Sequence, residues 1–175
     1  FSSHIGCYEV AGYSLISKTK RFNALVFGGE KATVMAGRQE VLGHHNIRMI
    51  PVKEDMSHLF LVNEALDNNE IMSIPADRII GSAKSVTSVF MDAEARFPAG
   101  PLSVATMKGQ DVLAVNVMKT SAKHYKVYVA RLSYDKQAPR RQQIQQLADS
   151  YVKELEHRVR QYPLQWFNFY DFWSR

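Results

Sequence analysis

Short apolar runs alternate with apolar residues at helical spacing over residues 1–118. After an opening segment, 1–3, that has the pattern of a strand end, the predicted strands lie at 22–27, 47–52, 70–74 and 112–118. The predicted helices lie at 8–16, at 30–42, and from an N-terminal cap at Asp55 or Ser57 to Leu66. This alternation predicts an α/β fold: a layered sandwich with a central, largely parallel or mixed sheet flanked by helices.

The second half of the chain is less regular. Its predicted elements are a mobile loop at 82–88, a hairpin of 86–91 with 93–97, a helix at 101–108, an edge strand at 125–134 and a long amphipathic helix at 140–161. The last residues, 166–173, are dense in aromatic side chains. No internal repeat or low-complexity linker separates these elements, so the sequence predicts a single domain spanning 1–175.

Composition narrows the class of protein. The chain has 175 residues, of which 46% are hydrophobic and 22% are charged, as in ordinary globular proteins. This excludes a disordered or collagen-like chain. Because the sequence contains one cysteine, Cys7, an internal disulfide scaffold is also excluded. No apolar run approaches the roughly 18 residues that a membrane span requires.

The net charge is positive but weakly informative. Lys and Arg number 22 against 17 Asp and Glu, which gives a formal charge of +5. Such a balance favours acidic partners, namely anionic lipid, nucleic acid or an acidic carrier protein. The sequence contains no block of five like charges and no recognisable nucleic-acid-binding motif. We therefore expect no nucleic-acid partner.

His4 and Glu9 are the residues with the clearest candidate chemistry. They are spaced H-x4-E, where a strand end meets a helix start, and strand ends are where α/β sheets bind ligands. Residues five apart on one helix lie about 140° apart around its axis. His4 must therefore precede the helix for Glu9 to reach it. A carboxylate bonded to one ring nitrogen would leave the other free to accept a proton from a hydroxyl. A capping histidine beside an ordinary first-turn glutamate is the alternative interpretation of this spacing.

Two other kinds of chemistry have weaker support. Cys7 lies between His4 and Glu9 and suggests a thiol nucleophile, but nothing else in the sequence supports that role. The other five histidines have no metal-ligand spacing, so we expect neither a metal site nor a cofactor.

Four features, in order, resemble the lysophospholipid acyltransferase superfamily, and within it the lipid A biosynthesis (lauroyl/myristoyl) acyltransferases. They are the His4-x4-Glu9 motif followed by the strand at 23–27, the IPADR segment at 74–78, the FPAGP segment at 97–101, and the YPLQWF segment at 162–167. The last departs from the family, whose tryptophan is often followed by basic residues. That departure leaves the acceptor open.

The resemblance implies direct transfer of a fatty acyl group from an acyl thioester, on acyl carrier protein or coenzyme A, to a hydroxyl of a glycolipid or lysophospholipid. In that mechanism His4 is the general base and Glu9 orients it. The resemblance also implies substrate binding by Asp77 and Arg78, with Arg78 near the phosphate or carrier end, and by Gly100 and Pro101 through close backbone approach. The alternative is a catalytically silent module of the same fold that binds lipid or acyl carrier.

Family members usually carry a membrane-anchoring segment before the histidine motif. The resemblance therefore implies a protein at the cytoplasmic face of the bacterial inner membrane, either peripheral or anchored by a segment outside this sequence. The expected domain is the catalytic, C-terminal part of such an enzyme.

Overall fold

The structure is a computed structural model that describes residues 1–8, 10–11, 17–29, 36–37, 47–79 and 84–173. The chain divides into two compact units, one made of Phe1–Tyr8 with Pro75–Arg175 and the other of Glu9–Ile74. Most of the helices predicted at 8–16 and 30–42 lies outside the described residues, as does Glu9. A single domain spanning the whole chain remains a prediction.

A three-stranded parallel sheet forms the centre of the smaller unit. Its middle strand, β1 (Phe22–Val26), pairs with β2 (Ile47–Pro51) on one side and β3 (Ile71–Ser73) on the other. Helix α3 (His58–Asp67) packs on this sheet through Val62 and Ala65. The order β2, α3, β3 confirms the strand–helix alternation predicted over 47–74, and the parallel sheet with its helix confirms the α/β class.

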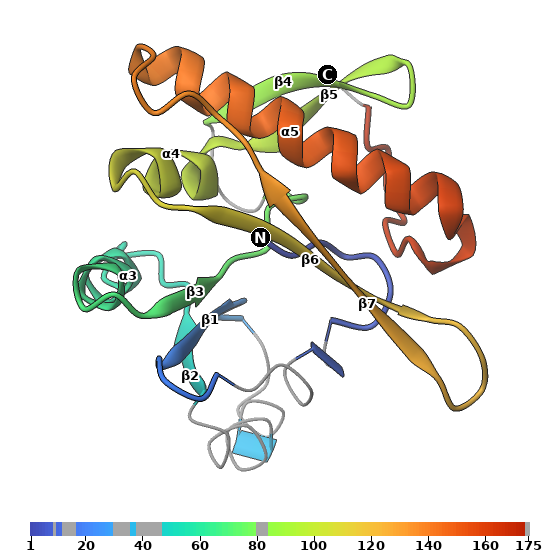
Figure 1. Ribbon diagram of the computed structural model, residues 1–175, viewed down its shortest axis with the longest axis horizontal. Helices are drawn as coiled ribbons and strands as arrows, with labels where there is room; N and C mark the ends of the chain where they lie inside the picture. Colours follow the sequence, from blue (N-terminus) through green and yellow to red (C-terminus); the bar gives the residue numbers. More distant parts are fainter. Residues whose placement is uncertain (9, 12–16, 30–35, 38–46, 80–83, 174–175) are drawn as a thin grey trace. The chain divides into compact units, whose positions relative to one another are not determined.

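The larger unit is built from two antiparallel hairpins and two helices (Figure 1). Its elements, in chain order, are β4 (Ser85–Phe90), β5 (Ala93–Pro98), α4 (Ala99–Met107), β6 (Val112–Lys119), β7 (Tyr125–Leu132), α5 (Arg140–Gln161) and the short 3-10 helix η1 (Pro163–Gln165). β4 pairs with β5 and β6 with β7. The predicted hairpin, edge strand and long helix are confirmed.

The loop predicted at 82–88 is wrong over its second half, because Ser85 already begins β4. Small polar residues are typical of loops, but Ser88 lies in a strand and is buried. Its hydroxyl is satisfied there, because it hydrogen-bonds to Asp149 of α5 at 2.7 Å. The parallel order predicted through residue 118 also ends early, since β4–β5 and β6–β7 are antiparallel. The helix predicted at 101–108 begins two residues sooner, at Ala99.

The N-terminal segment of the chain is extended and lies between distant parts of the sequence. Ser2 pairs in parallel with Pro75, Gly6 in parallel with Val117, and Ile5 antiparallel with Trp166. Segments that are about 70, 110 and 160 residues apart in sequence therefore meet along residues 1–6.

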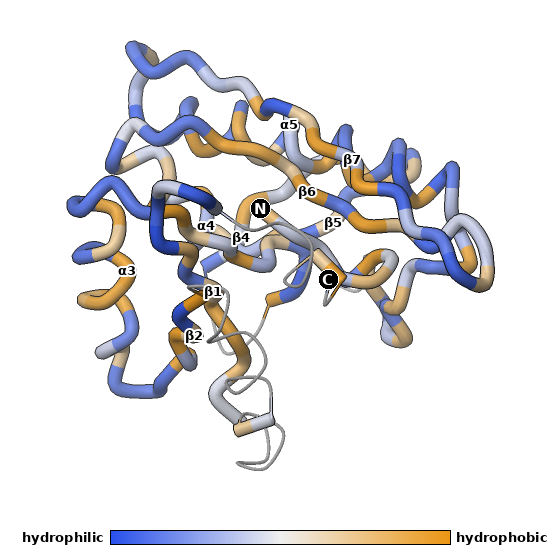
Figure 2. The backbone as a smooth tube through the Cα atoms, turned by 60° about the horizontal axis from the view of Figure 1, so that its bottom comes forward, coloured by the Kyte–Doolittle hydropathy of each residue, from blue (hydrophilic) through white to orange (hydrophobic). Residues whose placement is uncertain are grey.

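The core of the larger unit lies between α5 and the strands. The predicted apolar stripe of α5 is confirmed: Leu147, Tyr151, Leu155 and Val159 are buried, and Ile144 packs against them. Figure 2 shows hydrophobic residues recurring along this helix and along β6. Charged residues occupy the outer side of α5, where Arg158–Glu154 and Arg160–Glu156 are ion pairs one turn apart.

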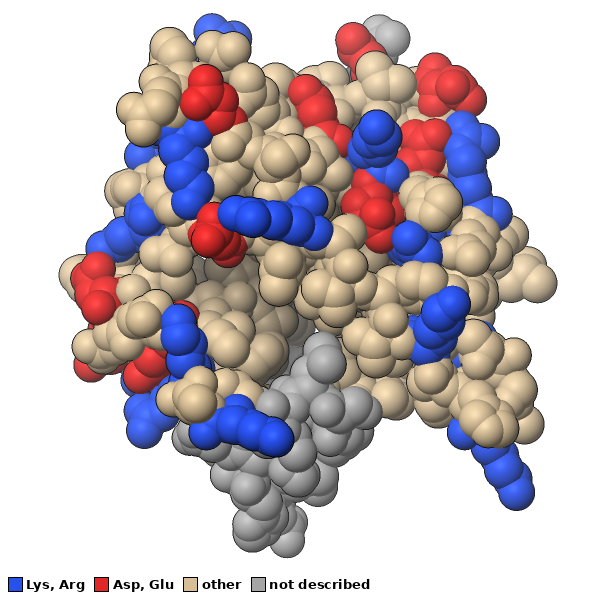
Figure 3. Space-filling view, viewed as in Figure 1, with Lys and Arg blue, Asp and Glu red and all other residues tan. Residues whose placement is uncertain are grey.

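Positive and negative side chains are interspersed on the face of the molecule seen in Figure 3. Among the described residues visible there, no continuous basic surface of the kind that binds a phosphate backbone is seen. The excess positive charge of the sequence is therefore not concentrated there.

Phe90 lies at the centre of an aromatic cluster that joins the hairpin to the C-terminal residues. It is fully buried, and its ring centroid lies 5.3–6.1 Å from those of four other aromatic residues. The four are Phe97, Trp166, Phe172 and Trp173.

We expect Phe90→Ala to lower the free energy of unfolding by about 3–5 kcal/mol, because it leaves a cavity where four rings now pack. Phe169→Ala is the matched control, since Phe169 is 88% exposed. Urea unfolding followed by tryptophan fluorescence measures both. Equal losses for the two variants would contradict this description of the core.

Candidate active site

His4 lies in the extended N-terminal segment, ahead of a helical turn that contains Tyr8, as the sequence analysis requires. Its backbone is fixed on both sides: its N–H donates to Asp77 Oδ2 at 2.7 Å, and its carbonyl accepts from the N–H of Phe167 at 3.0 Å. The Tyr8 ring stands edge-on to the imidazole, with centroids 6.0 Å apart. The orientation of His4 is therefore set by backbone and ring contacts together.

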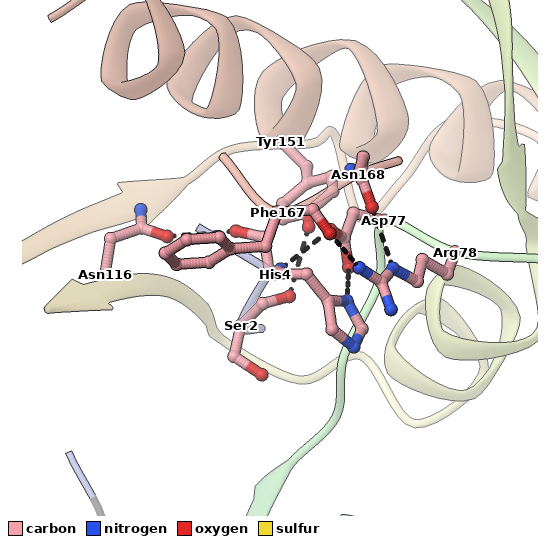
Figure 4. A network of polar contacts seen from close by, with 9 residues as sticks. Ser2, His4, Asp77, Arg78, Asn116, Tyr151, Phe167 and Asn168 are labelled. Atoms are coloured by element: carbon pink, nitrogen blue, oxygen red, sulfur yellow. Dashed lines mark hydrogen bonds and ion pairs between the residues drawn. The ribbon is translucent and has the colours of Figure 1, made fainter. Parts of the chain in front are cut away.

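Asp77 holds His4 at two points (Figure 4). Besides accepting from the backbone, it contacts the ring, with Oδ1 at 2.8 Å from His4 Nδ1. The Asp77 side chain is fully buried, whereas that of His4 is 23% exposed. Asp77 thus faces the protein interior and the imidazole lies between it and the surface.

This contact determines which ring nitrogen is available for chemistry. A carboxylate offers only acceptors, so the Nδ1 atom that faces it carries the proton. In the neutral ring Nε2 then has a free lone pair. Figure 4 shows Nε2 on the side of the ring turned away from Asp77, and within the described part of the chain it makes no hydrogen bond. The arrangement suits a general base.

A buried polar layer supports the segment around His4. Tyr151 of α5 donates to the carbonyl of Ser2 at 3.1 Å, and Ser3 donates to Asn116 of β6 at 2.9 Å. Burial, and then the negative charge of Asp77, raise the pKa of Tyr151 well above its usual value. The Tyr151 hydroxyl therefore remains protonated and keeps donating its hydrogen bond at any physiological pH.

Arg78 turns toward the C-terminal segment of the chain. Its Nε donates to Asn168 Oδ1 at 2.7 Å, and its Nη2 donates to the carbonyl of Phe167. The sequence analysis assigns Arg78 to substrate binding. In the structure two of its donors link the chain after Asp77 to the residues that hold the His4 carbonyl, and its role in substrate binding stays a prediction.

Gly6 makes a sharp turn immediately after His4. Its φ is +69°, and a Cβ there would lie 2.1 Å from the carbonyl oxygen of Val117. Only glycine combines this backbone conformation with so close an approach. Its N–H donates to the carbonyl of Gln165, and the next N–H, of Cys7, donates to that of Val117. The turn therefore fixes where the helix after His4 begins.

The predicted site residues have different places in the structure. His4 and Asp77 are brought together, with Arg78 beside them, while Glu9 lies outside the described residues. Gly100 and Pro101 are in the first turn of α4, and no hydrogen bond of the described chain joins them to His4. A Cβ on Gly100 would meet nothing within 4 Å, so its surroundings are open. Their role in binding remains a prediction.

The sequence analysis missed the contact of Asp77 with His4. Both residues follow short segments that pair, but the register of that pairing is not encoded in the local pattern of either segment. In the structure Ser2 pairs in parallel with Pro75, and each site residue lies two positions further along. Two residues of extended chain return a side chain to the same face, so this register brings the two side chains together.

Neither a metal site nor a membrane-spanning helix is found. Within the described ranges, no group of three His, Cys, Asp or Glu side chains is placed to hold a metal ion. Among the same residues, no helix is both long enough and apolar enough to cross a bilayer.

A family model described as bacterial lipid A biosynthesis acyltransferase matches residues 1–175, the whole of the chain. No curated protein sequence matches the chain closely enough to be compared with it.

We expect Gly6→Ala to destabilise the protein more than Gly109→Ala does. Both glycines have positive φ, +69° and +59°, but a Cβ on Gly109 would meet nothing within 4 Å. Gly109→Ala should therefore cost only the left-handed backbone penalty of about 1–2 kcal/mol. Gly6→Ala adds a clash with the Val117 carbonyl. Urea unfolding of both variants tests this, and equal losses would show that the clash is relieved.

Proposed function

Because the chain belongs to the bacterial lipid A biosynthesis acyltransferase family, we propose that it transfers a fatty acyl group from an acyl thioester to a hydroxyl of a lipid A-type glycolipid or lysolipid, with His4 as the general base. The observation that carries this proposal is the two-point contact of Asp77 with His4, which leaves Nε2 free. Acyl carrier protein or coenzyme A carries the donor, and no cofactor takes part. The reaction takes place at the cytoplasmic face of the inner membrane, where both substrates meet.

The proton and the acyl group move in a balanced sequence. The acceptor hydroxyl gives its proton to His4 Nε2, and its oxygen forms a bond to the thioester carbonyl carbon. The tetrahedral intermediate collapses with cleavage of the C–S bond, and the departing thiolate takes the proton back from Nε2. Asp77 is the positioning residue, because it fixes the tautomer and stabilises the imidazolium that forms between the two steps.

Glu9 is the second carboxylate in this proposal. The sequence motif gives Glu9 the role of orienting His4, but Nδ1 of His4 already contacts Asp77. One ring N–H donates a single strong hydrogen bond, so the two carboxylates cannot both hold Nδ1 in this way. We propose that Glu9 offsets the charge of the imidazolium while Asp77 sets the ring orientation.

We expect His4→Ala to lower kcat by about 10²–10⁴-fold, the contribution typical of a general base. The assay follows labelled acyl groups from acyl carrier protein or coenzyme A to a phosphorylated glycolipid. His157→Ala, at an exposed position of α5, is the matched control and should keep full activity. If His4→Ala transfers acyl groups at the wild-type rate, the mechanism is refuted. Substrate binding by a wild type that transfers nothing would favour the silent binding module.

We expect Asp77→Asn to lower kcat by a similar factor while KM changes little. The amide must point its NH₂ group at either Nδ1 or the His4 backbone N–H. Facing Nδ1, it moves the ring proton to Nε2, which can then no longer accept one.

The readout that separates positioning from simple stability is the ¹⁵N NMR spectrum of the His4 ring. The proton should lie on Nδ1 in the wild type and on Nε2 in Asp77→Asn. An unchanged ring spectrum together with unchanged kcat would remove Asp77 from the mechanism. Loss of activity in Glu9→Gln alone would then leave Glu9 as the orienting residue.

A further inference from the structure

A cavity of about 580 Å³ opens next to the His4 segment in the larger unit. It is lined by Gly6, Cys7, Lys119, Thr120, Ser121, Tyr125, Gln165 and Phe167. The volume is comparable to that of small-molecule sites, but the cavity is shallow and widely open to solvent.

The cavity adjoins the general base through two connections. Gly6 is two residues beyond His4, so their Cα atoms are at most about 7 Å apart. Phe167 lines the cavity and also donates its backbone N–H to the His4 carbonyl. The cavity therefore borders the backbone of the segment that carries His4.

Most polar groups of the lining are already paired. The Gln165 side chain bonds to both backbone groups of Lys119, accepting at 2.9 Å and donating at 2.8 Å. The hydroxyls of Thr120 and Ser121 bond to His124. Aromatic Tyr125 and Phe167 form other parts of the lining.

The lining contains one cationic side chain, the ammonium of Lys119. Within the described residues it forms no ion pair or hydrogen bond, although Gln165 fixes its backbone at both polar groups. An anchored backbone with an unpaired cation, beside an aromatic lining, suits a ligand that has an apolar stem and an anionic end. Arg78 is less suited, because two of its donors bind Asn168 and Phe167.

We infer that this cavity binds the phosphate-bearing part of one of the two substrates, with Lys119 as the counter-ion of the phosphate. The inference rests on the proposed function. The phosphate comes either from the phosphopantetheine arm of the thioester donor or from a phosphorylated glycolipid acceptor.

Steady-state kinetics of Lys119→Ala distinguish the two sources. We expect KM to rise about tenfold for the substrate whose phosphate binds here, the size of one charge-assisted hydrogen bond, with kcat little changed. A rise for the donor assigns its phosphopantetheine arm, and a rise for the acceptor assigns the glycolipid. Lys119→Arg should remain near wild type. Lys123→Ala removes an exposed lysine of the same hairpin turn and is the control. Equal effects of Lys119→Ala and Lys123→Ala, or none, overturn the inference.

Alkylation of Cys7 gives a second test that does not depend on activity. Cys7 is half-buried and lines the cavity, so a bound ligand should slow its reaction with iodoacetamide, followed by peptide mass spectrometry. The probes are palmitoyl-coenzyme A against palmitoyl-pantetheine, and a phosphorylated glycolipid against its dephosphorylated form. The site is supported if one phosphorylated probe protects Cys7 from alkylation and this protection is lost in Lys119→Ala.

The two tests separate failure of the site from failure of the proposed function. Protection of Cys7 in a protein that transfers no acyl group would support the cavity and refute the proposed reaction. Acyl transfer without protection, and without a KM change in Lys119→Ala, would leave the reaction standing and refute the cavity.

Discussion

The buried carboxylate of Asp77 is the constraint on which the site depends. A charge taken out of water must be paired, and both oxygens of Asp77 are within hydrogen-bond distance of His4 donors, one on the backbone and one on the ring. The pairing stabilises the carboxylate and at the same time fixes the imidazole. Stability and chemistry therefore require the same geometry, and the imidazole cannot rotate away without leaving Oδ1 of the buried carboxylate without its ring partner.

That geometry is assembled from four distant segments. The N-terminal residues pair with Pro75 and Val117, and the C-terminal residues pair back through Ile5 and Trp166. Three of the four motifs that carry the family resemblance lie at these places: the histidine motif, the segment ending at Arg78 and the segment ending at Phe167. Their wide spacing in sequence is explained by their meeting around one side chain. Phe167, for example, holds the His4 carbonyl and accepts from Arg78.

Much of the fold follows from local pattern. Apolar periodicity predicted β1, β2, β3 and β6, the β4–β5 hairpin and the buried stripe of α5, because each buries one face. Local pattern failed where a tertiary contact outweighs composition. The small polar residues around Ser88 predicted a loop, but Ser88 lies in β4 and its hydroxyl bonds to Asp149. His4 was recognisable from its motif. The role of Asp77 was not, because strand register is set by pairing between segments 73 residues apart, and no local pattern encodes it.

The two cationic side chains near the His4 segment, Arg78 and Lys119, differ in the contacts that they make within the protein. Arg78 follows Asp77 directly and was the natural candidate for a phosphate, and its position after a buried carboxylate also places it beside Asn168 and the Phe167 carbonyl, which accept two of its donors. Lys119 ends β6, where Gln165 satisfies its backbone, and its ammonium has no partner among the described residues. The guanidinium is therefore held in one orientation by the scaffold, although its other N–H groups remain available. The ammonium of Lys119 is held by no such contact, and this difference is why the proposal places the phosphate there.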